Sequence, residues 1–372
     1  MTANVAGSEN GVPSPSSDDP LPEWWMYRGT GVPHDGIDRL PEAPPWRSFP
    51  YRAARDDLLE ISAPPADPVG DRKGRRPPSS LYQVDRAEVH LVNMALLLRR
   101  PLLVTGSPGV GKSTLAHSIA HELNLGPVLR WSVTSRTSLQ DGLYQYDAIG
   151  RLQDAGLTGH RPSAPHGRGG ARGNRLAQSL AIGRYLRLGP LGTAFLPWRK
   201  PRVLLIDEID KSDVDFPSDL LHVFEEGEFS VPELARLHTP SAQVMTTDDQ
   251  SWVEVRQGKV RCHEFPVVVM TSNEERDFSP AFLRRCIRLE IPQPDETKLV
   301  RLLAAHLPTP GSEVSPVHEE LIREFLRRQG EDGAQLANDQ LLNAVLIARQ
   351  LWDSSEGREA VVNHLLRPLN EA

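Results

Sequence analysis

Cysteine is scarce in this sequence. Only Cys262 and Cys286 occur among 372 residues, each beside a segment with the pattern of a strand. Two thiols do not form the disulfide framework of a small secreted domain, so they favour a reducing, cytoplasmic compartment. The first ten residues, MTANVAGSEN, have neither a basic start nor an apolar centre, and we therefore expect no secretory signal.

Long hydrophobic runs are absent as well. The longest are short segments such as FPVVVM at 265–270, far below the roughly 20 apolar residues that span a bilayer, so we expect no membrane segment. The formal net charge is −7, which makes a nucleic acid an unfavourable partner. Residues 155–206 nevertheless contain no Asp or Glu. This basic stretch either faces a partner or forms a solvated loop.

The 33 prolines are unevenly distributed and mark boundaries along the chain. Residues 1–22 are rich in Ser, Pro, Asp and Gly, and residues 63–80 have the composition of a linker, so we expect 1–80 to form a Pro-rich, largely disordered N-terminal tail. Two segments within it, 22–31 and 43–51, carry the tryptophans Trp24, Trp25 and Trp46. Exposed tryptophans are costly, so we expect these rings to pack either on the rest of the chain or on a partner.

From residue 81 onward, strand patterns alternate with helical patterns. We expect helices over 84–100 and 112–123, and strands over 101–105, 127–133, 203–206, 265–270 and 287–291. This alternation predicts an α/β domain over 81–292, with a parallel sheet between helices. We expect two insertions within this domain, at about 140–180 and 230–264, and the second contains a hairpin that turns at Gly258. The helical pattern of 293–372 predicts a small second domain.

The segment GSPGVGKS at 106–113 matches the phosphate-loop pattern G-x-x-x-x-G-K-[ST] in full. Its glycines let successive backbone N–H groups face one anion at the start of a helix. Lys112 supplies a positive charge for the β and γ phosphates, and the Ser113 hydroxyl is a ligand for Mg²⁺. A chance glycine-rich turn is the alternative, but the strand before it and the helix after it are the context that the motif requires. We expect ATP on the loop residues Gly106, Ser107, Pro108, Gly109, Val110, Gly111, Lys112, Ser113 and Thr114.

Paired carboxylates, Asp207 and Glu208, follow the apolar run 203–206. In phosphate-loop proteins a second strand presents an acid to the Mg²⁺ shell, and the neighbouring residue polarises the attacking water. Asp207 is therefore the candidate metal ligand together with Ser113, and Glu208 is the candidate general base. A solvated acidic turn is the alternative. Asp210 and Asp213 are interpreted as surface or capping residues.

Three further polar residues are candidates for catalysis. Asn273 follows the strand at 265–270, where it is placed to hold the attacking water or the γ phosphate, although such residues are usually turn formers. Arg284 and Arg285 lie on a predicted short helix before the strand at 287–291. They are too far along the chain to be placed in their own site, so we consider them for a neighbouring subunit's ATP. A surface arginine pair is the alternative.

In this order and spacing, GSPGVGKS, VLLIDEID, VVVMTSN and AFLRRC resemble the AAA+ ATPases, and the stretches at 132–155 and 188–229 resemble the MoxR-type branch. The resemblance covers roughly 81–353. It implies a P-loop AAA+ core, a small C-terminal helical lid over 293–372, and a ring, typically a hexamer, with ATP and Mg²⁺ at subunit interfaces.

The resemblance also implies roles for single residues. Lys112 and Ser113 match the Walker A positions, Asp207 and Glu208 match Walker B, and Asn273 matches sensor 1. Arg285 is the preferred arginine finger, with Arg284 as the fallback.

Two further stretches bear on this resemblance, one that departs from the family's pattern and one that leaves two interpretations open. The usual sensor 2 arginine is missing from LANDQLLNAV, which has Asp339 and Gln340 in its place, so either another lid arginine serves or sensing of the γ phosphate by the lid is weak. The stretch QDGLYQYDAIGRL occupies the position of the branch's extra hairpin and helix. Tyr144 and Tyr146 there either grip a substrate or pack in the core.

The sequence leaves three functional hypotheses open. The first is a ring-forming ATP hydrolase that remodels a protein client, as a MoxR-like chaperone, for which the resemblance implies a von Willebrand factor A-domain partner. The second is a nucleotide-dependent switch or scaffold in a signalling or defence assembly, with little turnover. The third is a DNA-acting AAA+ motor, which the negative net charge disfavours.

Overall fold

The computed structural model describes residues 21–47, 49, 57–61, 82, 84–158, 182–237, 240–248, 251–306, 316–330, 336–351 and 354–368. The predicted linker at 63–80 lies outside these residues, and so do the first twenty residues and much of the basic stretch.

The core is a five-stranded parallel sheet with the order β11-β1-β10-β5-β2. Its strands are β1 (Leu102–Thr105), β2 (Leu129–Ser132), β5 (Val203–Asp207), β10 (Val267–Thr271) and β11 (Ile287–Glu290). Every predicted core strand is therefore present, and the parallel α/β expectation is confirmed. The inner strands β5 and β10 are buried along their whole length, because both faces of the sheet are covered.

Alternate residues of these strands belong to two different layers. Leu205 and Val269 pack with α1 (Arg86–Leu98) and α2 (Lys112–Glu122) on one face. Leu204 and Val268 pack on the other face with α6 (Pro190–Ala194), α7 (Phe216–Glu226) and α9 (Pro280–Leu283). The two-residue period of a strand thus sorts one apolar run into two cores.

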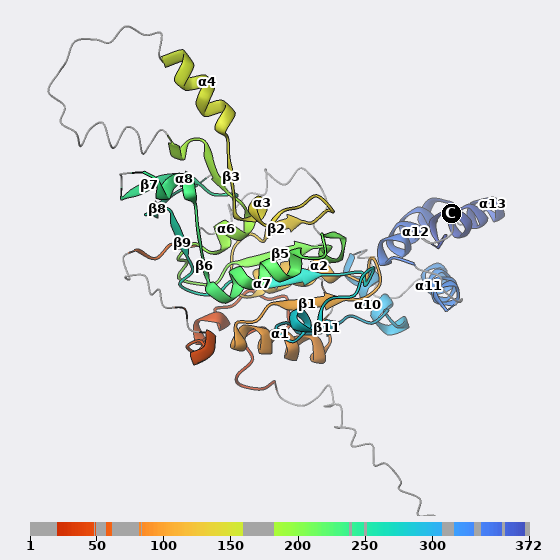
Figure 1. Ribbon diagram of the computed structural model, residues 1–372. Helices are drawn as coiled ribbons and strands as arrows, with labels where there is room; N and C mark the ends of the chain where they lie inside the picture. The colour runs from red at the N-terminus through yellow and green to blue at the C-terminus, as the bar shows by residue number, and fades with distance from the viewer. Residues whose placement is uncertain are drawn as a thin grey trace, which may run out of the picture.

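A second sheet is built from the predicted insertions together with two short strands that lie at or just outside their bounds, β4 and β6. Its order is β3-β4-β7-β8-β9-β6, and its strands are β3 (Tyr144–Tyr146), β4 (Leu186–Leu188), β6 (Glu228–Ser230), β7 (Ser241–Met245), β8 (Trp252–Arg256) and β9 (Lys259–Arg261). The short helices α3 (Leu139–Leu143) and α8 (Pro232–Ala235) accompany it, and α4 (Ala148–Thr158) projects away from it (Figure 1). Gln257 and Gly258 both have positive φ between β8 and β9, which confirms the predicted hairpin turn.

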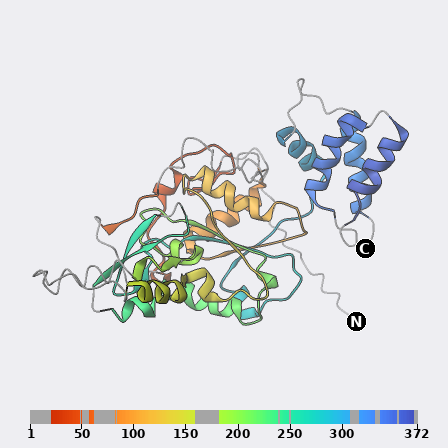
Figure 2. The ribbon, with the colours of Figure 1, turned by 90° about the horizontal axis from the view of Figure 1, so that it is seen from above.

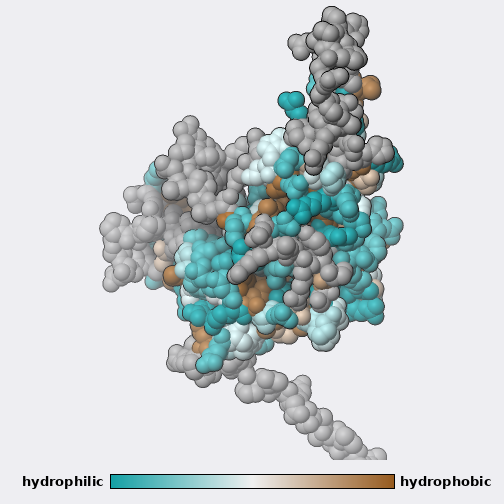
Figure 3. All heavy atoms as spheres, turned by 90° about the vertical axis from the view of Figure 1, so that its left-hand side faces the viewer, coloured by the Kyte–Doolittle hydropathy of each residue, from teal (hydrophilic) through white to brown (hydrophobic). Residues whose placement is uncertain are grey.

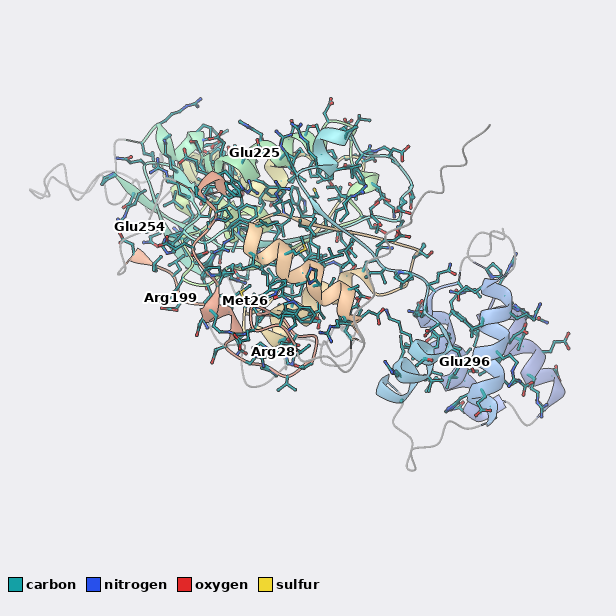
Figure 4. The ribbon with its side chains drawn as sticks, turned by 90° about the horizontal axis from the view of Figure 1, so that it is seen from below. Met26, Arg28, Arg199, Glu225, Glu254 and Glu296 are labelled. Atoms are coloured by element: carbon teal, nitrogen blue, oxygen red, sulfur yellow. The ribbon has the colours of Figure 1, made fainter. Side chains whose placement is uncertain are left out.

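Residues 21–47 do not form the separate tail that the composition favoured. Trp25, Met26, Tyr27 and Ile37 are buried in the same cluster as α1 and α2, and the segment includes two 3₁₀ turns, η1 (Gly36–Arg39) and η2 (Pro45–Arg47). Met26 and Arg28 lie beside this helical layer (Figure 4). Its proline and glycine content favoured disorder, but its few large apolar side chains are buried against the helices.

The tryptophans of this segment differ in their surroundings. Trp25 packs on the chain itself, as one of the two alternatives predicted. Trp24 is partly exposed and meets His90 of α1 edge to face, with ring centroids 5.2 Å apart. Trp46 is 72% exposed. On the face of the molecule seen in Figure 3, polar residues predominate and apolar ones form only small patches.

Two buried polar side chains hold the segment in place. Asn93 of α1 accepts the N–H groups of Met26 and Tyr27 at 2.7 and 3.0 Å, and its amide nitrogen donates to the Tyr27 carbonyl at 2.7 Å. Glu122, the last residue of α2, accepts the N–H groups of Gly29 and Gly31. Most of these partners are backbone groups, and the side chains of Thr30 and His34 add two further contacts to Glu122, both at 3.3 Å.

The C-terminal part is helical and has its own apolar core. It comprises α10 (Glu296–His306), α11 (Pro316–Gln329), α12 (Asn338–Leu351), α13 (Ser355–Ala360) and a π turn, η7 (Val361–Leu365). It stands to one side of the α/β core in Figure 2. The helical pattern predicted for 293–372 is thus present in the part of this region that the structure describes. Among the residues described, no helix has both the length and the apolarity needed to cross a membrane.

The clamp on the N-terminal segment leads to a stability prediction. We expect Asn93→Ala to lower the free energy of unfolding by about 2–4 kcal/mol, because it leaves buried backbone N–H and C=O groups without partners. Urea denaturation measures the change. Gln153→Ala, which removes an exposed amide from α4, is the control and should cost less than about 0.5 kcal/mol. Equal stability of both variants would show that the clamp does not hold the segment.

Candidate functional site

The glycine loop joins β1 to α2 and has the backbone that its motif predicts. Gly106 and Gly109 have φ values of 139° and 75°, in a region that favours glycine. A Cβ on Gly106 would lie 2.4 Å from the carbonyl oxygen of Ile291, and one on Gly109 would lie 2.3 Å from the Cβ of Ala337. The loop is therefore in close contact with the residue after β11 and with the residue before α12.

Lys112 lies inside the loop rather than in solvent. Its Nζ donates to the carbonyl oxygens of Gly106 and Ser107, at 2.6 and 2.8 Å, and to Oδ1 of Asn273 at 2.7 Å. Burial lowers the pKa of Lys112, and the nearby carboxylates, Asp210 first, oppose that shift. This hydrogen bond brings together two predicted site residues, Lys112 and Asn273, that are far apart in the sequence.

The Asp207 carboxylate is the hub of the site. Its Oδ1 accepts hydrogen bonds from the hydroxyls of Ser113 and Thr271, both at 2.7 Å, and its Oδ2 accepts one from Arg130 at 2.7 Å. Burial on its own raises the pKa of Asp207, but these three hydrogen bonds outweigh it and the net pKa is lowered. The group is therefore held as a carboxylate.

A hydroxyl and a carboxylate are oxygen donors that suit Mg²⁺, so Ser113 and Asp207 fit the predicted metal position. In the described part of the chain, no group of three or more His, Cys, Asp or Glu side chains is placed to hold a metal ion. A cation here would need further oxygen ligands from phosphate or water. That requirement is typical of Mg²⁺ bound together with a nucleotide.

Glu208 points elsewhere, although it is next to Asp207. It has a φ of 62° just beyond β5, and its N–H donates to the Thr271 hydroxyl at 2.9 Å. Its carboxylate is 44% exposed and pairs with Lys211 at 2.9 Å. The turn at the strand end therefore separates the paired carboxylates, one buried at the loop and one toward solvent.

Asp210 corrects a prediction. It was interpreted as a surface or capping residue, but it is buried on the 3₁₀ turn η6 (Ile209–Lys211). Its Oδ2 accepts the N–H groups of Asn273 and Glu275 at 2.8 and 3.2 Å. It fixes the chain that presents Asn273, and no local pattern indicated this because its partners come from β10's end. Asp213 is exposed, as predicted.

Two other site residues were missed by the sequence reasoning. Thr271, the last residue of β10, links Asp207 to the N–H of Glu208. Arg130 reaches Asp207 from β2, where Ser132 is the residue in register with Asp207. A threonine and an arginine near strand ends carry no motif, so only the strand order reveals them.

Arg284 and Arg285 are not part of the loop's own site. Both precede β11, and the Arg284 carbonyl accepts a hydrogen bond from Arg100, which precedes β1. They therefore lie at the amino edge of the parallel sheet, whereas the loop is at the carboxyl edge. Arg285 is bound to Glu225 of α7, which is labelled in Figure 4. The Arg284 side chain is exposed and makes no hydrogen bond or ion pair with any described residue.

The remaining candidate positions have structural surroundings. Tyr144 is buried, which confirms packing for that ring, and Tyr146 accepts a hydrogen bond from Arg151 at 2.8 Å. At the start of α12, Gln340 accepts the N–H of Ala337 and donates to the Arg367 carbonyl, both at 2.8 Å. Gln340 is thus a helix-capping residue at the position where an arginine was expected.

Known proteins resemble this chain in two ways. The family model of the AAA domain (dynein-related subfamily) matches residues 101–286, half of the chain, and the match contains the loop, both carboxylates, Asn273 and both arginines. A curated relative, the 1D-myo-inositol 2-acetamido-2-deoxy-alpha-D-glucopyranoside deacetylase of Corynebacterium efficiens, is 36% identical over 89 residues. That match covers 22% of this chain and 29% of the relative, so it does not carry the relative's activity over.

The buried position of Asp210 leads to a second stability prediction. We expect Asp210→Asn to destabilise the protein by about 1–3 kcal/mol, because an amide cannot replace the charged acceptor of two backbone N–H groups without loss. Asp213→Asn, a change of the same kind at an exposed position just after the turn, should stay within about 0.5 kcal/mol. Thermal and urea unfolding of both variants measure the difference, and equal effects would contradict the anchoring role.

Proposed function

We propose, for a chain that belongs to the AAA-domain family in its dynein-related subfamily, that the site described above binds ATP with Mg²⁺ and hydrolyses it. The convergence of Lys112, Ser113, Asp207 and Asn273 at one edge of the sheet is the observation that carries this proposal. A glycine loop supplies N–H donors and an ammonium group for phosphates. The carboxylate and hydroxyl beside it suit the cation that accompanies them.

Each residue has a separate role in this proposal. The loop N–H groups and Lys112 bind the phosphates, and Ser113 and Asp207 would hold Mg²⁺, which neutralises charge on the phosphate oxygens. Asn273, fixed by Asp210, orients the attacking water. Glu208 accepts the proton from that water. To do so its carboxylate must leave Lys211 and turn to the water, which its exposed side chain permits.

We further propose a ring of identical subunits that remodels a protein client, in the manner of the MoxR-type branch. The support is the position of Arg284 and Arg285 at the edge of the sheet opposite to their own loop, where they are available to a neighbour's site. Because Arg285 is held by Glu225 within its own chain and Arg284 is free of described side-chain partners, we favour Arg284 as the residue that acts in trans. The von Willebrand factor A-domain partner stays a prediction.

A nucleotide-dependent switch is the second candidate. The observation that favours a switch is the identity of the residue at the start of α12. Gln340 caps the helix there, so that position supplies no arginine to the loop. In that case ATP occupancy would change the contacts of the C-terminal helices without rapid turnover.

The first test measures ATPase rate against protein concentration, with molar mass by light scattering. In a ring with shared sites we expect the rate per subunit to rise with assembly. Glu208→Gln should lower turnover at least about 100-fold while ATP still binds, because only the base is lost. Glu226→Gln, an exposed change on α7, is the control. A flat rate near zero, with tight ATP binding by the unsubstituted protein, would favour the switch instead.

The second test separates the two arginines. Arg284→Ala should reduce turnover by about 1,000-fold with nucleotide affinity kept, since it removes a charge from the transition state. Arg285→Ala should act mainly on stability through the lost pair with Glu225. Mixing Arg284→Ala with Lys112→Ala should restore part of the activity, because mixed rings contain intact interfaces. Absence of rescue on mixing would argue against an arginine in trans.

A further inference from the structure

Arg130 makes an unusual contact for a residue beside a magnesium site. Its Nη2 lies 2.7 Å from Oδ2 of Asp207, the carboxylate to which we assign the cation. Within the described residues, Asp207 is the one side chain with which Arg130 forms an ion pair or hydrogen bond. A guanidinium therefore takes part of the acceptor capacity that a cation would use.

The two partners differ strongly in their surroundings. The Asp207 side chain is 10% exposed, whereas that of Arg130 is 61% exposed. Arg130 lies opposite Leu205 in the β2–β5 register, two residues before the pair Ser132 and Asp207. Its long side chain must extend along the strand to reach Asp207, and most of it stays in solvent. Such a side chain can move without disturbing the core, while Asp207 is fixed by the hydroxyls of Ser113 and Thr271.

The contact also has an electrostatic consequence. A guanidinium and a divalent cation on the same carboxylate repel each other, and partial burial reduces the screening between them. The other two donors on Asp207 are neutral hydroxyls, so they compete with a cation only for lone pairs. Arg130 is thus the one positively charged group hydrogen-bonded to Asp207 in the described structure.

We propose that Arg130 is an electrostatic gate on Asp207, which occupies the carboxylate in the nucleotide-free state and must be displaced when Mg²⁺ enters with the nucleotide. This inference rests on the proposed function and adds a regulatory step to the same site. The phosphate groups alone bind to the loop and Lys112 and leave Arg130 in place. The cation, and not the nucleotide alone, therefore displaces Arg130 from Asp207. The strength of the Arg130–Asp207 pair sets the Mg²⁺ concentration at which this displacement occurs.

Binding of a fluorescent ADP analogue tests the gate without reliance on turnover. The analogue is titrated first in EDTA, and Mg²⁺ is then added at one fixed nucleotide concentration, so that chelation in solution is the same for all variants. We expect Arg130→Gln to lower the half-saturating Mg²⁺ concentration by about fivefold, with affinity in EDTA unchanged. Arg136→Gln removes the same charge from an exposed position in the segment after β2 and should leave both quantities unchanged.

The other outcomes overturn the proposal in distinguishable ways. An unchanged Mg²⁺ midpoint in Arg130→Gln would mean that the ion pair is only structural, and the proposed function would stand. A loss of affinity in EDTA would mean that Arg130 contacts the phosphates. Failure of the unsubstituted protein to bind the analogue in either buffer would overturn the proposed function and the gate together. Circular dichroism confirms that the exposed substitutions leave the fold intact.

Discussion

The carboxylate of Asp207 is the point on which the site depends. Asp207 is the last residue of β5. Its carboxylate accepts hydrogen bonds from the hydroxyls of Thr271 at the end of β10 and Ser113 at the start of α2, and it forms an ion pair with Arg130 of β2. Four elements of the core thus meet at one buried charge. Such a group is costly unless its partners remain in place, so the strand ends and the glycine loop are fixed relative to each other by the same residue that we assign to the metal.

A second set of contacts links the glycine loop to the C-terminal helices. The loop is packed against Ile291 at the exit from β11 and against Ala337 at the entrance to α12, while Lys298 of α10 pairs with Glu88 of α1. The C-terminal helices therefore contact the loop through backbone and small side chains. A change in the loop on nucleotide binding would reach them by packing, which is consistent with the absence of an arginine at the start of α12.

The N-terminal segment is the largest difference between expectation and structure. Its composition predicted a tail, yet Tyr27 is fully buried and donates to or accepts from the Ser118 hydroxyl of α2 at 2.8 Å. Further along, Leu59 exchanges backbone hydrogen bonds with Pro197 and Arg199 near the second sheet. The segment thus contacts the helix that begins at the phosphate loop and the region of the insertions, so it belongs to the core in structural terms.

The sequence by itself predicted the five strands of the core sheet, the helices α1 and α2, the glycine loop and the residues Lys112, Ser113, Asp207 and Asn273, because each rests on local spacing along one segment. The roles of Asp210, Thr271 and Arg130 were decided only by the tertiary structure, since the partners of these side chains lie on strands that are neighbours in the sheet and distant in the chain. The same holds for residues 21–47. Proline and glycine describe the flexibility of a free chain, but whether a segment is ordered depends on the buried surface and hydrogen-bond acceptors that another part of the fold offers to it.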